Sequence, residues 1–258
     1  MRFIIINKRI PKINSYLIND FLFYTKVNLK ISKGNFYFCS DKIKLKEYLI
    51  KKINKKNILE TISIIKDKKD IAEFILKKNQ IIKPSHMSGA IIFTNKFKNI
   101  IEIKKIMHIW LNTDFYSFYR EKNYKNLEKR ILVENDLTVS SNVSDLKVFC
   151  YNGKIKFFQI DFGRFTKHKR QFLDLDWNLI NVQWQYEQLI QKFKKPIFFN
   201  NIIESCNVIA KDFDFVRIDF LITESQYFCN ELTFVPGKAE DKFNSIIDEK
   251  ILSKYFFS

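Results

Sequence analysis

The most constraining feature of this sequence is the segment FVRIDFLITESQYFCNELTFVPG, residues 215–237. Two runs rich in Val, Ile, Phe and Tyr flank a polar turn at 223–226, and this pattern predicts a β-hairpin. Each run is interrupted by a carboxylate, Asp219 in the first and Glu231 in the second. Because an unpaired buried charge is costly, we expect these acids either to pair with basic residues or to bind a metal.

Composition limits the kind of protein that the chain can form. With 258 residues, 46% of them hydrophobic, it is long enough to bury a large core as one complex domain or two lobes. Aromatic residues make up 16%, which argues against disorder. The sequence has only 5 Gly and 4 Pro, so long flexible linkers are not expected.

The chain is strongly basic, with a formal net charge of +17. Such a charge favours anionic partners, among them nucleic acids, nucleotides, acidic glycans and the anionic face of a membrane. The lysines are dispersed along the chain, so most are expected on a solvated surface and we expect no nucleic-acid partner. One short stretch contains Lys42, Lys46, Lys51, Lys52, Lys55 and Lys56.

Cysteine and histidine spacing indicates neither a disulfide framework nor a zinc site. The four cysteines are far apart with no CxxC pair, and the three histidines have no zinc-ligand spacing with them. The apolar run in MRFIIIN is too short for the core of a signal peptide, and no other segment approaches the length of a membrane span. We therefore expect a cytoplasmic protein.

Four segments have the apolar periodicity of helices. Ser40 or Asp41 caps the first, which is expected to run to Ile53 with Leu45 and Leu49 on its apolar face. The second, about 70–78, is expected to bury Ile71, Phe74 and Ile75. The others span 99–111 and 200–213.

Strand patterns occupy much of the rest. Residues 80–95 predict strand, loop and strand, and residues 130–137 predict a single strand. Residues 146–162 predict a hairpin turned at Asn152–Gly153, which is among the strongest short-range turn signals. The chain is therefore expected to be α+β, with mainly antiparallel strands and helices packed beside them.

One loop has the character of a phosphate-binding loop. Lys83 ends an apolar strand and precedes Pro84 and the small, polar segment 85–90. A loop of this kind can lie over nucleotide phosphates, with backbone N–H groups and the ammonium offsetting their charge. It lacks the GxxxxGK[ST] pattern and a following helix, so it is not a Walker loop.

Further charged residues interrupt or end apolar strands. Each of them alone is expected to be an ordinary surface charge. Together with Asp219 and Glu231 they form an ordered series, in which phosphate-binding bases precede metal-binding acids. These residues are Glu134, Lys147, Arg164, His168, Arg170 and Arg217.

Several blocks resemble a known family. IIKPSHMSG, DLKVFCYNGKIKFFQIDFGRFTKHKRQFLDLDWN and NELTFVPG are similar, in order, to segments of the TupA-like ATP-grasp proteins. This bacterial family is associated with teichuronopeptide, capsule and other surface-polysaccharide synthesis. The resemblance runs from about Asp41 to Gly237, and residues 1–40 match nothing that we can name.

The resemblance implies an ATP-grasp fold, in which two α+β lobes with mainly antiparallel sheets clasp ATP. It also implies a division of the chain into three parts. Residues 1–75 would form an N-terminal region, 76–136 the small lobe with the phosphate loop, and 137–258 the C-terminal lobe with the metal site.

The resemblance also implies roles for single residues. Asp219, Glu231 and Thr233 would bind one or two Mg²⁺ ions, with Thr233 in the place where many ATP-grasp proteins have Asn. His168 and Arg170 would bind the acidic substrate. Relatives usually carry His-Gly-Ser-Gly in the phosphate loop, whereas this loop has the single glycine Gly89. The catalytic group would be Arg164, Lys147 and Arg217, and the ATP-binding group Lys83, Ser88, Gly89, Glu134, Asn135, Leu137 and Lys147.

The implied reaction is ATP-dependent ligation of a carboxylate to an amine through an acyl phosphate. The acid would be a uronic acid or similar carboxylate of a surface polysaccharide, and the amine an amino acid, amino alcohol or amino sugar. Contact with the inner face of an anionic membrane would suit such a substrate. The alternatives are a sugar kinase, a glycosyltransferase and a non-catalytic binding module. For the glycosyltransferase, the DLDW motif at 174–177 is expected to lack the usual preceding apolar strand.

Overall fold

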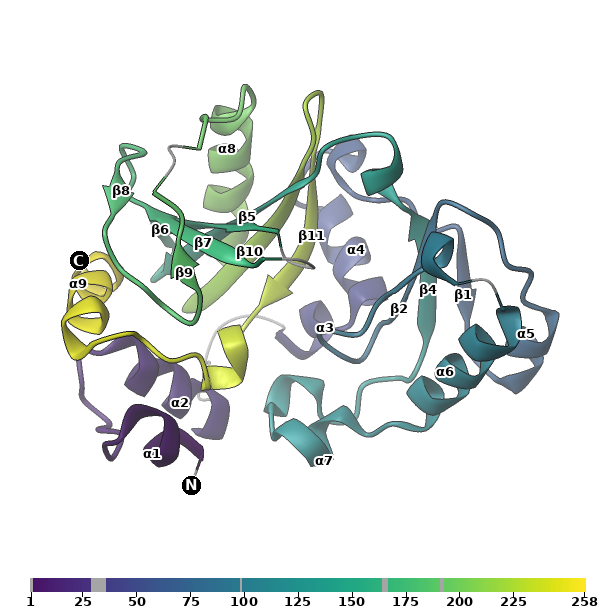
Figure 1. Ribbon diagram of the computed structural model, residues 1–258, viewed down its shortest axis with the longest axis horizontal. Coiled ribbons are helices and arrows are strands. Elements are labelled where there is room, and N and C mark those ends of the chain that lie inside the picture. Colours follow the sequence, from purple (N-terminus) through teal and green to yellow (C-terminus); the bar gives the residue numbers. More distant parts are fainter. Residues whose placement is uncertain (1, 29–35, 98, 164–166, 191–192) are drawn as a thin grey trace.

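The computed structural model describes residues 2–28, 36–97, 99–163, 167–190 and 193–258 (Figure 1). Two sheets lie side by side with helices around them, and α3 (Phe36–Ser40) and α4 (Lys42–Ile50) lie between the sheets. Within these ranges no helix is long and apolar enough to cross a membrane. The helices and the two sheets confirm the α+β prediction.

The smaller sheet is antiparallel and has the strand order β1-β4-β2-β3. Its strands are β1 (Ser63–Ile65), β4 (Ile131–Asn135), β2 (Gln80–Pro84) and β3 (Ile92–Phe93). Helices α5 (Lys68–Glu73) and α6 (Ile100–Asn112) lie beside it (Figure 1). Ile82 and Val133 pack with Ile103 and Met107 into one apolar core.

The larger sheet has the strand order β11-β10-β5-β6-β7-β8, and the short β9 pairs with β7 in parallel. The predicted turn Asn152–Gly153 joins β5 to β6, and both residues have positive φ, 51° and 73°, as a type I′ turn requires. The strands are β5 (Ser144–Tyr151), β6 (Lys154–Phe162), β7 (Lys169–Leu173), β8 (Leu179–Ile180), β9 (Glu187–Gln188), β10 (Phe215–Ile222) and β11 (Tyr227–Thr233).

Helices cover both faces of the larger sheet. On one face α8 (Phe199–Ala210) and α4 pack against Val148, Phe158 and Ile218. On the other face α2 (Ile18–Asn28) and α9 (Ile246–Phe257) pack against Phe149, Phe157 and neighbouring aromatic rings. The remaining helices are α1 (Arg2–Asn7) and α7 (Phe115–Tyr119). The short 3₁₀ helices are η1 (Lys55–Asn57), η2 (Thr94–Lys96), η3 (Lys122–Tyr124), η4 (Leu137–Val139) and η5 (Pro236–Ala239).

The second of these faces changes character along its strands. Side chains alternate across a strand, so Phe215 on β10 lies on the same face as Arg217 and Asp219. On β5, Lys147 shares that face with Phe149. The aromatic end supports α2 and α9, and the charged end carries the candidate site residues.

The N-terminal segment belongs to both halves of the molecule. Strand β1 pairs with β4 in the smaller sheet, whereas α2 packs against α9 and the larger sheet. The division of the chain at 75/76 and 136/137 stays a prediction.

Three predicted helices end earlier than expected. Helix α8 ends at Ala210 and not at residue 213. Helix α4 ends at Ile50 and not at Ile53. Helix α5 spans Lys68–Glu73 and not 70–78, because Asp67 caps its first turn and Phe74 already has an extended conformation. Ile75 is consequently 74% exposed, so the prediction that it is buried is wrong.

The expectation that no apolar strand precedes the DLDW motif is also wrong. Strand β7 ends at Leu173, immediately before Asp174, and its last four residues are buried. The Asp174 carboxylate accepts hydrogen bonds from the backbone N–H groups of Asp176 and Asn178, so it stabilises the turn that joins β7 to β8.

Asp41 is fully buried and connects α4 with the smaller sheet. Its carboxylate accepts from the backbone N–H groups of Ile43 and Lys44, at 2.9 and 3.3 Å, and pairs with Arg130 at 2.8 Å. Asp67 caps α5 through equivalent backbone contacts but in an exposed position and without an arginine.

These two caps give a matched comparison. We expect Asp41→Ala to lower the free energy of unfolding by about 3 kcal/mol or more, because it removes a cap and leaves Arg130 without this buried partner. Asp67→Ala should cost only about 1 kcal/mol. Urea titrations measure both, and equal losses would show that the Arg130 pair contributes nothing beyond the cap.

Candidate active site

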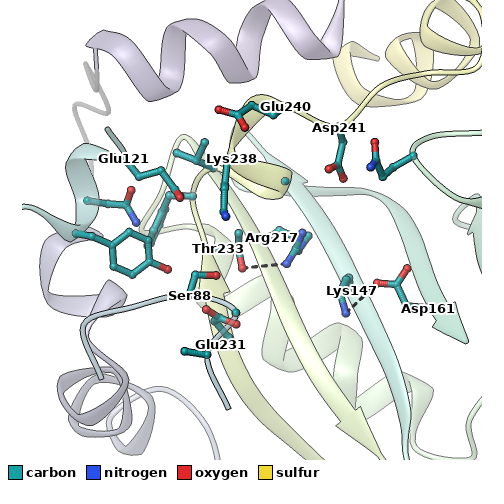
Figure 2. A pocket seen from close by; sticks show the side chains of 18 of the residues that line it. Ser88, Glu121, Lys147, Asp161, Arg217, Glu231, Thr233, Lys238, Glu240 and Asp241 are labelled. Atoms are coloured by element: carbon teal, nitrogen blue, oxygen red, sulfur yellow. Dashed lines mark hydrogen bonds and ion pairs between the residues drawn. The ribbon is translucent and has the colours of Figure 1, made fainter. Parts of the chain in front are cut away.

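A cavity of about 650 Å³ lies between the phosphate loop of the smaller sheet and the charged end of the larger one (Figure 2). It is lined from three directions, by the loop after β2, by β5–β7 and by β10–β11 with the segment that follows. Many of the predicted site residues line it together: Lys83, Ser88, Gly89, Lys147, His168, Arg170, Arg217, Glu231 and Thr233.

Strands β10 and β11 place the two acids of the predicted hairpin opposite each other. Asp219 pairs in register with Glu231. The Arg217 guanidinium donates to both oxygens of Asp219, at 2.7 Å from Nε, and its Nη2 also donates to Thr233 Oγ1 at 3.1 Å (Figure 2). Burial raises the pKa of Asp219, and the neighbouring Arg217 and Lys147 only partly offset it.

A bulge next to this pair connects the two sheets. The register shifts between Asp219 and Phe220, so Asn230 on β11 has no residue opposite it. Its Oδ1 accepts a hydrogen bond from Lys83 Nζ at 3.1 Å. Lys83 at the end of β2 is thereby fixed against the hairpin that carries the acids.

Glu134 forms an ion pair with the same lysine, Lys83. Its carboxylate is 1% exposed, lies 2.6 Å from Lys83 Nζ and also pairs with Lys46 of α4. Burial alone would raise the pKa of Glu134, but the two ammonium groups outweigh it and hold the pKa below its usual value. Glu134 does not line the cavity, and neither do the exposed Asn135 and the half-buried Leu137.

Asp161 on β6 is a candidate site residue that the sequence prediction missed. It accepts from Arg170 Nε at 2.7 Å and from Gln159, and lies 3.3 Å from both His168 Nε2 and Lys147 Nζ. Burial would raise its pKa, but the hydrogen bond from His168 and the charges of Lys147 and Arg170 hold the pKa well below its usual range. One ionised acid therefore positions three predicted site residues.

Two of the dispersed lysines are directed inward. Lys42 lines the cavity, donates to the carbonyl of Met87 and lies 3.9 Å from Glu231 Oε1. Lys46 contacts Glu134. The expectation covered most lysines of the chain, and these two are exceptions because helical spacing turns them toward the smaller sheet. Burial lowers the pKa of both.

Further residues complete the lining. Glu121, Asn123 and Tyr124 enter from the α7–η3 segment, and Lys238, Glu240 and Asp241 from the segment after β11. The sequence pattern singled out none of these six residues. Arg164, predicted to be catalytic, lies outside the described residues.

The donor set determines which ion would fit. Among the described residues no group of three or more His, Cys, Asp or Glu side chains could hold a metal. Asp219 and Glu231 alone suit Mg²⁺, which is usually bound by one or two carboxylates together with substrate phosphates and water. A metal bound here would depend on the nucleotide for further ligands.

Comparison with known proteins identifies the family. The sequence profile of the TupA-like ATP-grasp family matches residues 23–257. The chain belongs to this family. The match extends beyond the predicted limits of 41 and 237 on both sides, and it confirms the predicted family and fold. No match was found among curated proteins.

Solved structures similar to this chain include D-alanine–D-alanine ligase from Helicobacter pylori, with 14% identity, 84% coverage of this chain and a TM-score of 0.47. VanG D-Ala:D-Ser ligase from Enterococcus faecalis has 13% identity, 85% coverage and a TM-score of 0.44. The Bacillus anthracis D-alanine–D-alanine ligase complexed with ATP has 12% identity, 78% coverage and a TM-score of 0.42. This chain spans 61%, 60% and 57% of their lengths, respectively.

The Asp161 cluster generates a pH-dependent prediction. We expect Asp161→Asn to lower the free energy of unfolding by about 3 kcal/mol at pH 7, because Lys147 and Arg170 lose a buried partner. The pKa of Asp161 is lower in the folded state than its usual 3.8, so its stabilisation is present above pH 3.8 and is lost as the pH falls below that value.

Thermal unfolding of wild type and variant between pH 3 and pH 7 measures this effect. The gap in Tm should be constant near neutral pH and should narrow in acid. Asp176→Asn is the matched control, because Asp176 is exposed and outside the cluster. A gap that stays constant down to pH 3 would refute the ionised cluster.

Proposed function

We propose that this protein is an ATP-dependent ligase that joins a carboxylate to an amine through an acyl phosphate. The observation that carries the proposal is the pairing of Asp219 with Glu231 beside a cavity that basic residues enter from both sheets. Two neighbouring acids suit Mg²⁺, and the surrounding bases suit a triphosphate. Membership in the ATP-grasp family supports ATP as the phosphoryl donor.

The smaller sheet would hold the nucleotide. Lys83, positioned by Glu134 and Asn230, would contact the phosphates. A Cβ added at Gly89, whose φ is +76°, would meet nothing within 4 Å, so the loop of Ser88 and Gly89 has open space in front of it. The Glu134 carboxylate is occupied by lysines, so the adenine would be contacted by backbone groups near Asn135 and Leu137.

Residues of the larger sheet would take part in phosphoryl transfer and in the ligation that follows. A substrate carboxylate oxygen attacks the γ-phosphorus, the bond to the β,γ-bridging oxygen breaks, and ADP leaves. The amine, once it has lost its ammonium proton to water, attacks the acyl carbon and gives up a second proton as the amide forms, the bond to the phosphate oxygen breaks, and inorganic phosphate leaves with that electron pair. Lys147 and Arg217, with Arg164, would neutralise charge on the transferring phosphoryl group, and bound Mg²⁺ would supply further charge neutralisation.

We propose a uronic acid or a similar carboxylate of a surface polysaccharide, or its precursor, as the acid. The basic lining and the net charge of +17 suit such a substrate, and also contact with an anionic membrane surface. His168 and Arg170 are the candidate contacts for the acid. Both are oriented by Asp161, so the substrate would meet preorganised donors.

A sugar kinase would use the same nucleotide site and differ only in the acceptor. A glycosyltransferase fits less well, because the Asp174 carboxylate is engaged in its own turn and lies outside the cavity.

The acids at the β10–β11 pair give the first test. We expect Glu231→Gln and Asp219→Asn to abolish ADP release from MgATP, because an amide binds Mg²⁺ poorly. Both variants should still fold, with Asp219→Asn the less stable of the two because it weakens the buried pair with Arg217. Glu224→Gln, in the exposed turn of the same hairpin, is the control and should behave like wild type. Near-normal turnover by either acid variant would contradict the metal assignment.

The acyl phosphate gives the second test. With candidate uronic acids and hydroxylamine as a surrogate amine, we expect a hydroxamate, with ADP and phosphate released together. When the acid carries ¹⁸O in its carboxylate, the label should appear in the released phosphate. ADP formation with all label retained in the sugar would support the kinase instead.

A further inference from the structure

Two hydrogen-bond acceptors in the cavity have no donor among the residues that the structure describes. Glu121 and Asn123, at the start of η3, are 3% and 2% exposed and both line the cavity. Glu121 Oε1 and Asn123 Oδ1 are buried without a hydrogen-bond partner in the described part of the chain. Because buried polar atoms in proteins are almost always paired, two orphans from one segment point to a missing donor.

The charged neighbours of Glu121 do not supply that donor. Lys26 and Lys238 act on it electrostatically, as do the acids Glu231 and Glu240. Lys26, however, donates to Glu240 and to the carbonyl of Lys238, and Lys238 Nζ lies over the ring of Tyr119 at 3.5 Å. Burial consequently raises the pKa of Glu121 to about 7 in spite of the two lysines.

Tyr124 connects Glu121 and Asn123 to the part of the cavity where phosphoryl transfer is proposed. It is buried, lines the cavity and hydrogen-bonds to Ser88 of the phosphate loop. Both Glu121 and Glu231 act on it electrostatically. Figure 2 shows Glu121 beside Lys238, with Ser88 and Glu231 across the same cavity. A group bound at Glu121 would therefore lie close to the site of phosphoryl transfer and outside the part predicted for ATP.

The chemistry of the missing partner follows from these neighbours. Both orphaned atoms are hydrogen-bond acceptors, so a group that donates hydrogen bonds satisfies them directly. A hydroxyl would satisfy one acceptor but leave the buried charge of Glu121 uncompensated. A primary ammonium has three N–H donors and a positive charge, so it can bond both oxygens and neutralise the carboxylate.

We propose that Glu121 and Asn123 form the binding site for the ammonium group of the amine substrate. The inference rests on the ligase function proposed above and narrows the second substrate to a cationic primary amine. The site distinguishes an amine from the matching alcohol by charge, because only the amine compensates Glu121.

Ligand-observed NMR with the full chain and MgATP tests this site. The probes are ethanolamine, L-alanine and D-glucosamine, each paired with its hydroxyl analogue, ethylene glycol, L-lactate or D-glucose. At least one amine should bind wild type, and its analogue should bind more weakly. Glu121→Gln should weaken amine binding about tenfold or more, as expected when a charged hydrogen-bond partner is lost. Glu121→Asp, which keeps the charge, should restore part of the amine affinity that Glu121→Gln loses.

Two controls separate the outcomes. Glu73→Gln, an exposed residue of α5, should bind amines like wild type. Glu121→Gln should unfold at the same or a higher temperature than wild type, since it removes an unpaired buried charge, and MgATP should still stabilise it.

Absence of MgATP stabilisation in wild type would refute the proposed function itself. With that stabilisation present, three results would each overturn the ammonium site alone. They are no binding of any amine, equal binding of the hydroxyl analogues, and unchanged amine binding by Glu121→Gln.

Discussion

The buried carboxylate of Glu134 is the contact on which the geometry of the cavity depends. It lies on β4, pairs with Lys46 of α4 and Lys83 of β2, and through Lys83 reaches Asn230 on β11. Four elements from both sheets therefore meet at one acid. Residues Glu134 and Lys83 are diagonal neighbours, because Glu134 is in register with Ile81, two residues before Lys83. The antiparallel pairing thus places this acid beside the lysine that the phosphate-binding proposal requires.

Alternation along the strands explains why carboxylates interrupt apolar runs. In β10, Val216, Ile218 and Phe220 face the core under α8, while Arg217 lines the cavity and Asp219 lies on the same face of the strand, bonded to Arg217. A shift of one residue would exchange the two sets, burying both charges in an apolar layer. The hydrophobic core and the site are therefore specified by the same register, and neither can move without the other.

Local signals made much of this predictable. The Asn152–Gly153 turn, the β10–β11 hairpin and the strand before the phosphate loop each depend on a few adjacent residues. The Asp161 cluster does not depend on adjacent residues and was therefore not predicted. In the sequence Asp161 looks like an ordinary strand residue, and its partners Lys147 and Arg170 come from β5 and β7. Lys42 and Glu121 were missed for the same reason. Their significance comes from burial against segments distant in the sequence, which periodicity does not report.

The two ends of the cavity differ in how their charges are satisfied. At one end Asp161 is surrounded by donors, so its role is to hold Lys147, His168 and Arg170 in place before any ligand arrives. At the other end Glu121 is buried with an unpaired oxygen, so the folded protein bears the cost of that burial until a cation binds. A ligand at Glu121 would gain affinity by relieving this cost, in addition to the contacts that it makes. That gain requires the carboxylate to stay shielded from water, which links recognition of the amine to the packing of η3 against the phosphate loop through Tyr124 and Ser88.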